Sequence, residues 1–174
     1  VTALLSSLEA ERYIPKTGTI VIKPNVINDS PPPITTPAAC CQAIIAFIRS
    51  CSEAKIVIAE GCGQPNLTTQ TAFDKLGYID LAQQMDIELI DLNTAEVVHL
   101  QNPACRVFPE MYLPKIAVHS YLISVPVLKA HSLAGMTGAL KNMIGVAPPA
   151  YYSGRFGTWQ KAAFHAHLQQ AILD

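Results

Sequence analysis

The stretch YLISVPVLKAHSLAGMTGALKNMIGV, residues 121–146, joins an apolar segment to the densest group of reactive side chains in the chain. Its first part, YLISVPVL, is a continuous apolar run, which is typical of a strand buried on both faces of a sheet. Four side chains suited to ligand binding then follow in a short turn-and-helix segment: Lys129, His131, Lys141 and Asn142. We expect this stretch to form one wall of a small-ligand site.

The rest of the chain alternates apolar strands with helices. Three further short apolar runs, each bounded by turn residues, predict strands: 17–25 (TGTIVIKPN), 54–61 (AKIVIAEG) and 87–93 (IELIDLN). The residues between them predict helices over 36–50, 68–77 and 79–85. This order predicts an α/β fold with a mostly parallel central sheet and helices on both faces.

The remaining segments are less regular. Residues 1–15 predict a short amphipathic helix, and 96–100 is a candidate fourth strand. Residues 101–115 are interpreted as an edge strand or a hairpin, and a last helix follows 159. We expect one α/β domain over 1–174. Because the chain lacks an initiator Met and ends without a helix stop signal, we expect this domain to continue in the full gene product.

Composition and charge argue against several classes of function. The net charge is −1, so nothing attracts the whole chain to nucleic acid or to an anionic membrane. No apolar run reaches the roughly 18 residues of a membrane span, and the first residues do not resemble a secretory signal. Charged residues make up only 14%, against about 25% in typical domains. We therefore expect a cytoplasmic protein whose surface is partly covered, either in a homo-oligomer or by a missing C-terminal part.

The cysteines and histidines do not predict a metal site. The five cysteines include two adjacent ones and no CxxC pair, which is unfavourable for a disulfide framework, a zinc site or an iron–sulfur cluster. Cys62 lies between two glycines, but no base is identifiable beside it, so we do not expect a nucleophile. His165 and His167 are two apart on a predicted helix and face nearly opposite ways.

Polar clusters follow three of the predicted strands directly: KPN (23–25), EGCG (60–63) and KAH (129–131). Ligands of open α/β sheets bind beyond the carboxyl ends of the strands. If the strands are parallel, the three clusters meet at one edge, with Asp91 as a weaker member. The alternative is that strand ends simply need polar loops. We favour a site.

The residue types suit a phosphate or a carboxylate. Lys23, Lys129 and Lys141 supply positive charge, and Asn25 and Asn142 can orient the ligand. A helix that begins after the glycine-containing turn would add free backbone N–H groups for an anion. The alternative for the lysines is that they are solvated ends of buried stems.

The catalytic candidates are His131, Lys141 and Glu60. His131 changes charge near neutral pH, so it can serve as an acid, a base or a ligand, with Glu60 as its carboxylate partner. Glu60 has two open interpretations. It is either a structural partner of Lys23, which needs a carboxylate or a ligand when buried, or a general base or metal ligand.

Three threonines have proposed roles at helix starts or in ligand binding. Thr35 and Thr36 can donate hydroxyl groups to a phosphate, but Thr36 followed by Pro37 is more simply explained as the N-cap of the helix over 36–50. Thr137 is a candidate N-cap for the helix that follows the glycine-containing turn.

The segments IKPNV, TTP, IVIAEG, SVPVLKAH and GALKNMIGV occur in this order, and together they resemble domain-of-unknown-function family 362 (DUF362) from about residue 17 to 174. The resemblance implies an α/β domain from bacteria or archaea with no settled activity. Many members carry an attached ferredoxin-like module with 4Fe-4S clusters. Since this chain has no such cysteine run, an iron–sulfur cluster is not expected in it.

A more distant similarity is to the N-terminal domain of the nickel-pincer lactate racemase family. In that family a strand also leads to a histidine, a glycine-containing turn and a lysine that carries the cofactor. His131 and Lys141 match this order and spacing. Where that family places a histidine after its Gly-rich loop, this chain has GCGQPN, so the similarity supports the location of the site and not the nickel cofactor. The cofactor stays unknown.

Two functions remain open. The first is binding of an anionic small molecule or cofactor at the strand ends, for redox or isomerisation chemistry. The second is a non-catalytic protein-interaction subunit associated with an iron–sulfur electron-transfer partner. Its docking face would contain four aromatic residues: Tyr151, Tyr152, Phe156 and Trp159. The alternative for these aromatics, which we favour, is packing under the last helix.

Overall fold

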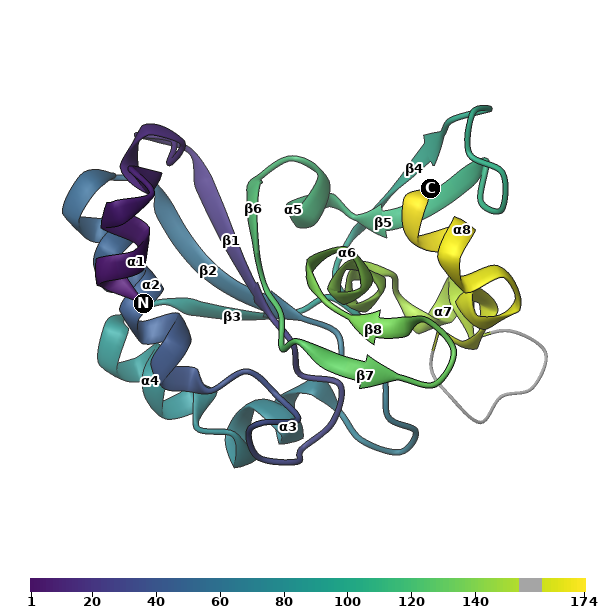
Figure 1. The fold of residues 1–174 in the computed structure, drawn as a ribbon, viewed down its shortest axis with the longest axis horizontal. Helices are drawn as coiled ribbons and strands as arrows, with labels where there is room; N and C mark the ends of the chain where they lie inside the picture. Colours follow the sequence, from purple (N-terminus) through teal and green to yellow (C-terminus); the bar gives the residue numbers. More distant parts are fainter. Residues whose placement is uncertain (154–160) are drawn as a thin grey trace.

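A four-stranded parallel sheet forms the centre of the computed structural model, which describes residues 1–153 and 161–174 (Figure 1). Its order is β3-β2-β1-β6. The strands are β1 (Thr19–Pro24), β2 (Lys55–Glu60), β3 (Glu88–Asp91) and β6 (Tyr121–Val125). All neighbouring pairs run parallel, so the four carboxyl ends lie at the same edge. The α/β fold with a mostly parallel sheet is confirmed.

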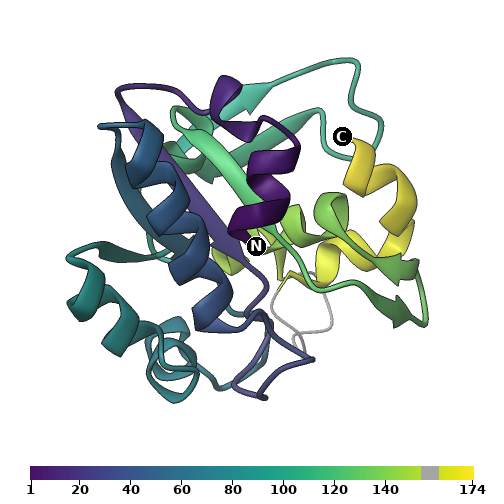
Figure 2. The same cartoon turned by 60° about the vertical axis from the view of Figure 1, so that its left-hand side comes forward.

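Helices cover one face of this sheet. They are α1 (Thr2–Ser7), α2 (Ala38–Cys51), α3 (Thr69–Lys75) and α4 (Tyr78–Met85); Figure 2 shows α1 and α2 in front of the strands. Ile20 and Ile22 of β1 point into this layer, whereas Val21 packs on the opposite face with Val57 and Leu92. Both faces are thus buried, which explains the continuous apolar strands.

The opposite face is covered by segments that follow β3. The hairpin β4 (Val97–Gln101) and β5 (Glu110–Pro114) leads into α5 (Lys115–Val118), and Leu113 and Ile116 pack against the sheet. The candidate fourth strand therefore exists, but it pairs antiparallel with β5 outside the central sheet. Its half-exposed residues do not suit a strand buried on both faces.

Beyond β6, the chain folds into short elements. These are β7 (Lys129–His131), β8 (Gly135–Thr137), α6 (Ala139–Asn142), η2 (Met143–Val146), α7 (Pro149–Tyr152), η3 (Ala162–His167) and α8 (Leu168–Leu173). The β7–β8 hairpin replaces the predicted turn, and α6 is only one turn long. The predicted last helix is divided between η3 and α8. A third apolar cluster joins α7 to these two elements.

The structure corrects two predicted helix starts and shows where two of the four aromatics of the candidate docking face lie, with Tyr151 exposed. Pro37 occupies the N-cap of α2, and Gly138 that of α6, so neither Thr36 nor Thr137 caps a helix. Tyr152 is buried against Phe164 rather than exposed, as expected for packing under the last helix. Phe156 and Trp159 of the predicted docking face lie outside the described residues.

The N-terminal helix is also shorter than predicted. The segment over 1–15 divides into α1 and the 3-10 helix η1 (Ala10–Arg12). Glu9 between them adopts a left-handed conformation, with φ of 51°, which ends the helical path. Gly77, the last residue of the predicted helix over 68–77, follows Leu76, the C-cap of α3, and adopts a positive φ of 74°, as expected for a glycine just past a helix end.

Candidate functional site

A cavity of about 560 Å³ lies at the carboxyl ends of β1 and β2. The β7–β8 hairpin, α6, η2 and η3 contribute its other walls. The structure brings together, as lining residues, seven of the nine predicted site residues: Lys23, Asn25, Glu60, Lys129, His131, Lys141 and Asn142. The parallel sheet explains this convergence, because it places the ends of β1, β2 and β6 side by side.

Lys23 and Glu60 form an ion pair in the floor of the cavity. The Lys23 Nζ lies 2.9 Å from the Glu60 carboxylate, and the two side chains are 0% and 3% exposed. Burial lowers the pKa of Lys23, and the charge of Glu60 opposes that shift. The carboxylate also accepts hydrogen bonds from the backbone N–H groups of Val26 at 3.1 Å and Gly61 at 2.8 Å. Of the two interpretations of Glu60, these contacts match the first, in which Glu60 is a structural partner of Lys23.

Asn142 connects α6 to the central sheet. Its Oδ1 accepts hydrogen bonds from Lys23 Nζ and Asn25 Nδ2, both at 3.2 Å. Its Nδ2 donates to the Lys23 carbonyl at 3.2 Å and to Ser124 Oγ at 3.0 Å. Lys129 extends this network, because its Nζ donates to Asn25 Oδ1 at 2.9 Å. The two asparagines, one in α6 and one directly after β1, therefore hold Lys23 and Lys129 in place.

His131 lies in the cavity wall as a neutral imidazole. Its Nδ1 accepts hydrogen bonds from the backbone N–H groups of Leu133 and Ala134, both at 3.1 Å. An acceptor Nδ1 requires that Nε2 carries the proton. Burial lowers the pKa of His131, and Lys141 adds to the shift. In this arrangement the ring can donate a hydrogen bond from Nε2. Among the described residues, no hydrogen bond joins it to Glu60.

Lys141 projects from α6 into the same cavity. It is partly buried, and burial lowers its pKa, with repulsion from Lys129 as the second cause. Within the part of the chain that the structure describes, its ammonium group makes no hydrogen bond or ion pair. Lys141 is therefore the lysine of this cavity whose charge is least satisfied by the protein.

Sequence reasoning missed Lys161 and His165, which line the cavity from the C-terminal segment. Lys161 is only 4% exposed, and burial lowers its pKa to about 7. Its Nζ donates hydrogen bonds to the carbonyl oxygens of Gly61 at 2.7 Å and Gly145 at 2.6 Å. Lys161 belongs to none of the three polar clusters that follow predicted strands and to no recognisable motif, so the sequence carries no signal that links it to the site.

Gly145 lies directly against the ion pair. A Cβ atom at this position would lie 2.6 Å from Lys23 Nζ and would also overlap Glu60 Oε1. At Gly61, a Cβ atom would lie 2.7 Å from Lys161 Nζ. Both distances are shorter than Cβ contacts in folded proteins, so glycine is required where η2 and the loop after β2 close over the buried lysines.

Thr35 and Thr36 lie outside the cavity wall. The Thr36 hydroxyl donates to the Val125 carbonyl at 2.7 Å and accepts from the Asn25 N–H at 2.9 Å. The Thr35 hydroxyl donates to the Ser30 carbonyl at 2.6 Å. Both threonines are buried, and both hydroxyl groups are engaged with the backbone. They support the loops around the site.

The remaining candidates are engaged within the protein. The Cys62 thiol is buried and donates to the Ile27 carbonyl at 3.2 Å, and burial raises its pKa. Asp91 Oδ1 accepts from Thr69 Oγ1 at 2.7 Å and from the Asn93 N–H at 2.9 Å. Across residues 1–153 and 161–174, no group of three or more His, Cys, Asp or Glu side chains is placed to hold a metal ion.

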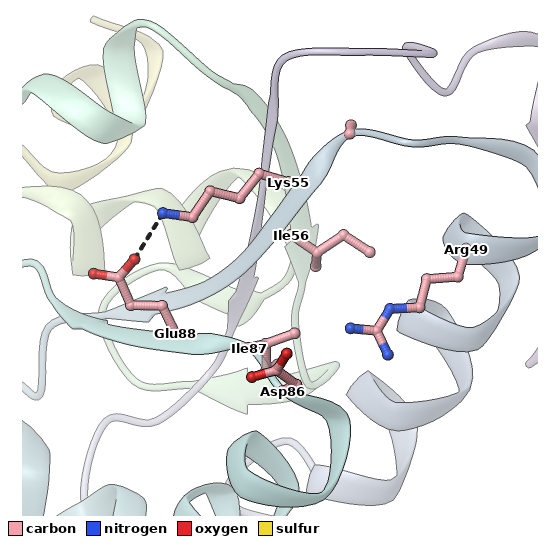
Figure 3. Close-up of a pocket in the computed structure, with 7 residues that line it drawn as sticks. Arg49, Lys55, Ile56, Asp86, Ile87 and Glu88 are labelled. Carbon is pink, nitrogen blue, oxygen red and sulfur yellow. Dashed lines mark hydrogen bonds and ion pairs between the residues drawn. The ribbon is translucent and has the colours of Figure 1, made fainter.

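A second hollow, of about 440 Å³, lies at the opposite end of the strands (Figure 3). Lys55 and Glu88, the first residues of β2 and β3, form an exposed ion pair there at 2.9 Å. Arg49 and Asp86 also line this hollow. Its charges are exposed and balanced, so it is a less suitable ligand site than the cavity at the carboxyl ends.

Comparison with known protein families supports the resemblance stated above. The family described as "Domain of unknown function (DUF362)" matches residues 20–174. The chain belongs to the DUF362 family. This DUF362 chain matches no curated protein and no solved structure, so its similarity to lactate racemase stays a prediction. The described residues of the DUF362 chain form no helix long and apolar enough to span a bilayer.

Proposed function

We propose that this chain binds an anionic small molecule or cofactor, through a phosphate or carboxylate group, at the carboxyl ends of its strands. The observation that carries the proposal is an imbalance of charge. Four lysines line the cavity: Lys23, Lys129, Lys141 and Lys161. Glu60 is the one carboxylate among the described lining residues. A bound anion would reduce the repulsion among these lysines. It would also stabilise their positive charge, which burial leaves poorly solvated.

Lys141 is the leading anion contact in this proposal. Lys23 is paired with Glu60, and Lys129 donates to Asn25. The ammonium of Lys141 lacks such partners among the described residues, and both burial and Lys129 disfavour its charge. His131 would donate a second hydrogen bond from its Nε2. Electrostatic attraction and hydrogen bonding would thus act on one ligand group.

The remainder of the cavity suits a small organic molecule. Ile27, Leu133 and Ile144 contribute apolar surface beside the lysines. A volume of about 560 Å³ falls within the range of roughly 300 to 1,000 Å³ that ligand pockets occupy. His131, Lys141 and Glu60 are compatible with proton transfer in an isomerisation or with a redox step.

The cysteines bear on the cellular location. All five are free thiols, which supports a location in the reducing cytoplasm of a bacterium or archaeon.

The direct test is ligand binding to the purified chain. Inorganic phosphate and a series of small carboxylates should raise the melting temperature above that in sodium chloride of equal ionic strength. Lys141→Met should weaken the binding of the best ligand at least tenfold in isothermal titration calorimetry. Lys55→Met is the matched control, because Lys55 is an exposed lysine at the opposite end of the sheet. Equal affinity in both variants, or no stabilisation beyond chloride, would contradict the proposal.

A second candidate function is self-association as a protein-interaction subunit. Four large apolar side chains are exposed on and beside the β7–β8 hairpin and α6: Leu128, Leu133, Met136 and Leu140. The low fraction of charged residues, 14%, also favours a covered surface. Light scattering should then give a dimer that Met136→Glu dissociates, whereas Leu4→Glu on α1 does not. A monomeric wild type would contradict self-association. The alternative would then be that an iron–sulfur electron-transfer protein binds this apolar surface.

A further inference from the structure

Lys161 is held in an unusual position for a lysine. It lies at the start of η3, and its Nζ reaches between the loop after β2 and the η2 segment. Among the described residues, its hydrogen-bond partners are two backbone carbonyl oxygens, at 2.7 Å on Gly61 and at 2.6 Å on Gly145. Because carbonyl oxygens carry no full charge, this environment does not neutralise an ammonium as a carboxylate would.

The geometry suits a neutral amine. A neutral amine has two N–H bonds, and Gly61 and Gly145 provide two acceptors for them. The lone pair is then left for a third partner. Since Lys161 lines the cavity, a ligand bound there can approach this nitrogen. A deprotonated, buried lysine is the form that attacks carbonyl compounds.

We propose that Lys161 forms an imine with an anionic carbonyl compound bound in the cavity, such as a 2-oxo acid or a phosphorylated aldehyde. This inference rests on the proposed anion site, because Lys141 and Lys129 would hold the carboxylate or phosphate. The Lys161 lone pair attacks the carbonyl carbon and forms the C–N bond. Both amine protons pass to the carbonyl oxygen, the C–O bond breaks as this oxygen leaves as water, and a C=N bond remains.

The charges around Lys161 favour this reactivity. Burial lowers its pKa to about 7, so a substantial fraction of the molecules carries the amine at pH 7. Lys23 also lowers the pKa, whereas Glu60, Asp91 and Cys62 raise it. An exposed lysine with a pKa near 10.4 is unprotonated in fewer than about one molecule in a thousand at that pH. Lys161 should therefore react well before an exposed lysine.

The test is reductive trapping on the wild-type chain. We would incubate the protein with glyoxylate, the smallest 2-oxo acid, and sodium cyanoborohydride at pH 7. The reductant delivers hydride to the imine carbon, and water supplies the proton on nitrogen. Peptide mass spectrometry should find one carboxymethyl group on Lys161, formed at least tenfold faster than on the exposed Lys55. Labelling of exposed lysines with Lys161 unmodified would overturn the proposal.

Two controls separate this inference from the anion site on which it rests. Glycolaldehyde is an uncharged aldehyde of similar size, and it should label Lys161 more slowly than glyoxylate. Lys141→Met should slow labelling by glyoxylate but not by glycolaldehyde. If both probes label Lys161 at the same rate in both proteins, the imine is supported and the anion site is contradicted. Lys161→Met should remove the fast label; its persistence on another lysine would overturn the assignment.

Discussion

At the scale of single residues, the site depends on a lysine that the fold buries completely. Lys23 is the second-to-last residue of β1, where its aliphatic stem is buried and its ammonium lies 2.9 Å from the Glu60 carboxylate. Desolvation of both charges costs several kcal/mol, which their attraction and the surrounding hydrogen bonds must offset. Gly145 contributes by leaving space, because its missing side chain lets η2 close over the pair.

Gly145→Ala should therefore destabilise the protein. The new Cβ would lie 2.6 Å from Lys23 Nζ and overlap Glu60 Oε1, so either the pair or η2 must move. We expect a loss of about 3 kcal/mol in the free energy of unfolding, measured by urea denaturation. Gly138→Ala is the control, since its Cβ would meet only Met136 Cε at 3.8 Å. Equal stability of both variants would contradict this prediction, because it would mean that η2 can shift at little cost in free energy.

At the scale of elements, the strands that carry the site are joined by side chains from loops. The Thr36 hydroxyl bonds the backbone of both Asn25, beyond β1, and Val125, the last residue of β6. Asn142 makes a similar connection from α6. These bonds continue the contact between β1 and β6 past the end of their ladder, which ends at the pair Pro24 and Val125.

Thr36→Val tests this connection. Valine has nearly the same shape, but it leaves the Asn25 N–H and the Val125 carbonyl without their partner in a buried region. Each unsatisfied buried group costs roughly 1 to 3 kcal/mol, so we expect a loss of about 2 to 4 kcal/mol on urea denaturation. Thr94→Val should change stability by less than about 0.5 kcal/mol, because Thr94 is exposed. A loss in Thr36→Val no greater than that of the control would contradict the connecting role.

At the scale of the whole molecule, the site is assembled from both ends of the sequence. Lys23 and Lys161 lie in the same cavity although most of the chain separates them. Two buried lysines with lowered pKa values also make the stability of the fold depend on pH. When the folded state holds a lysine as an amine and the unfolded state holds it as an ammonium, raising the pH favours folding.

The pH dependence of unfolding should reveal Lys161. Its pKa is about 7 in the folded chain and 10.5 when unperturbed, so between these values the unfolded state binds more protons. Its contribution to stability should rise by about 2 to 3 kcal/mol from pH 6 to pH 9. Urea denaturation of wild type and Lys161→Met across this range should show the wild type gaining relative to the variant. Parallel curves would indicate an ordinary pKa for Lys161.

Much of the fold followed from local patterns. The apolar runs that became β1, β2, β3 and β6 were recognisable because strands buried on both faces need no alternation. The β7–β8 hairpin was interpreted as a turn, since three-residue strands carry too little periodicity. The helix starts at Thr36 and Thr137 were wrong because those threonine side chains serve other contacts or lie in β8.

The sequence by itself determined the parallel sheet, the edge at which polar residues gather, and seven residues that line the cavity. Five of these belong to the polar clusters that follow three of the strands, and Lys141 and Asn142 come from the segment after the glycine-containing turn. The tertiary structure alone decided which charges are buried and paired. It brought Lys161 to the floor of the cavity, gave Gly145 its place against the ion pair, and engaged Thr35 and Thr36 with the backbone. These features depend on contacts between segments far apart in the chain, and local sequence patterns do not specify such contacts.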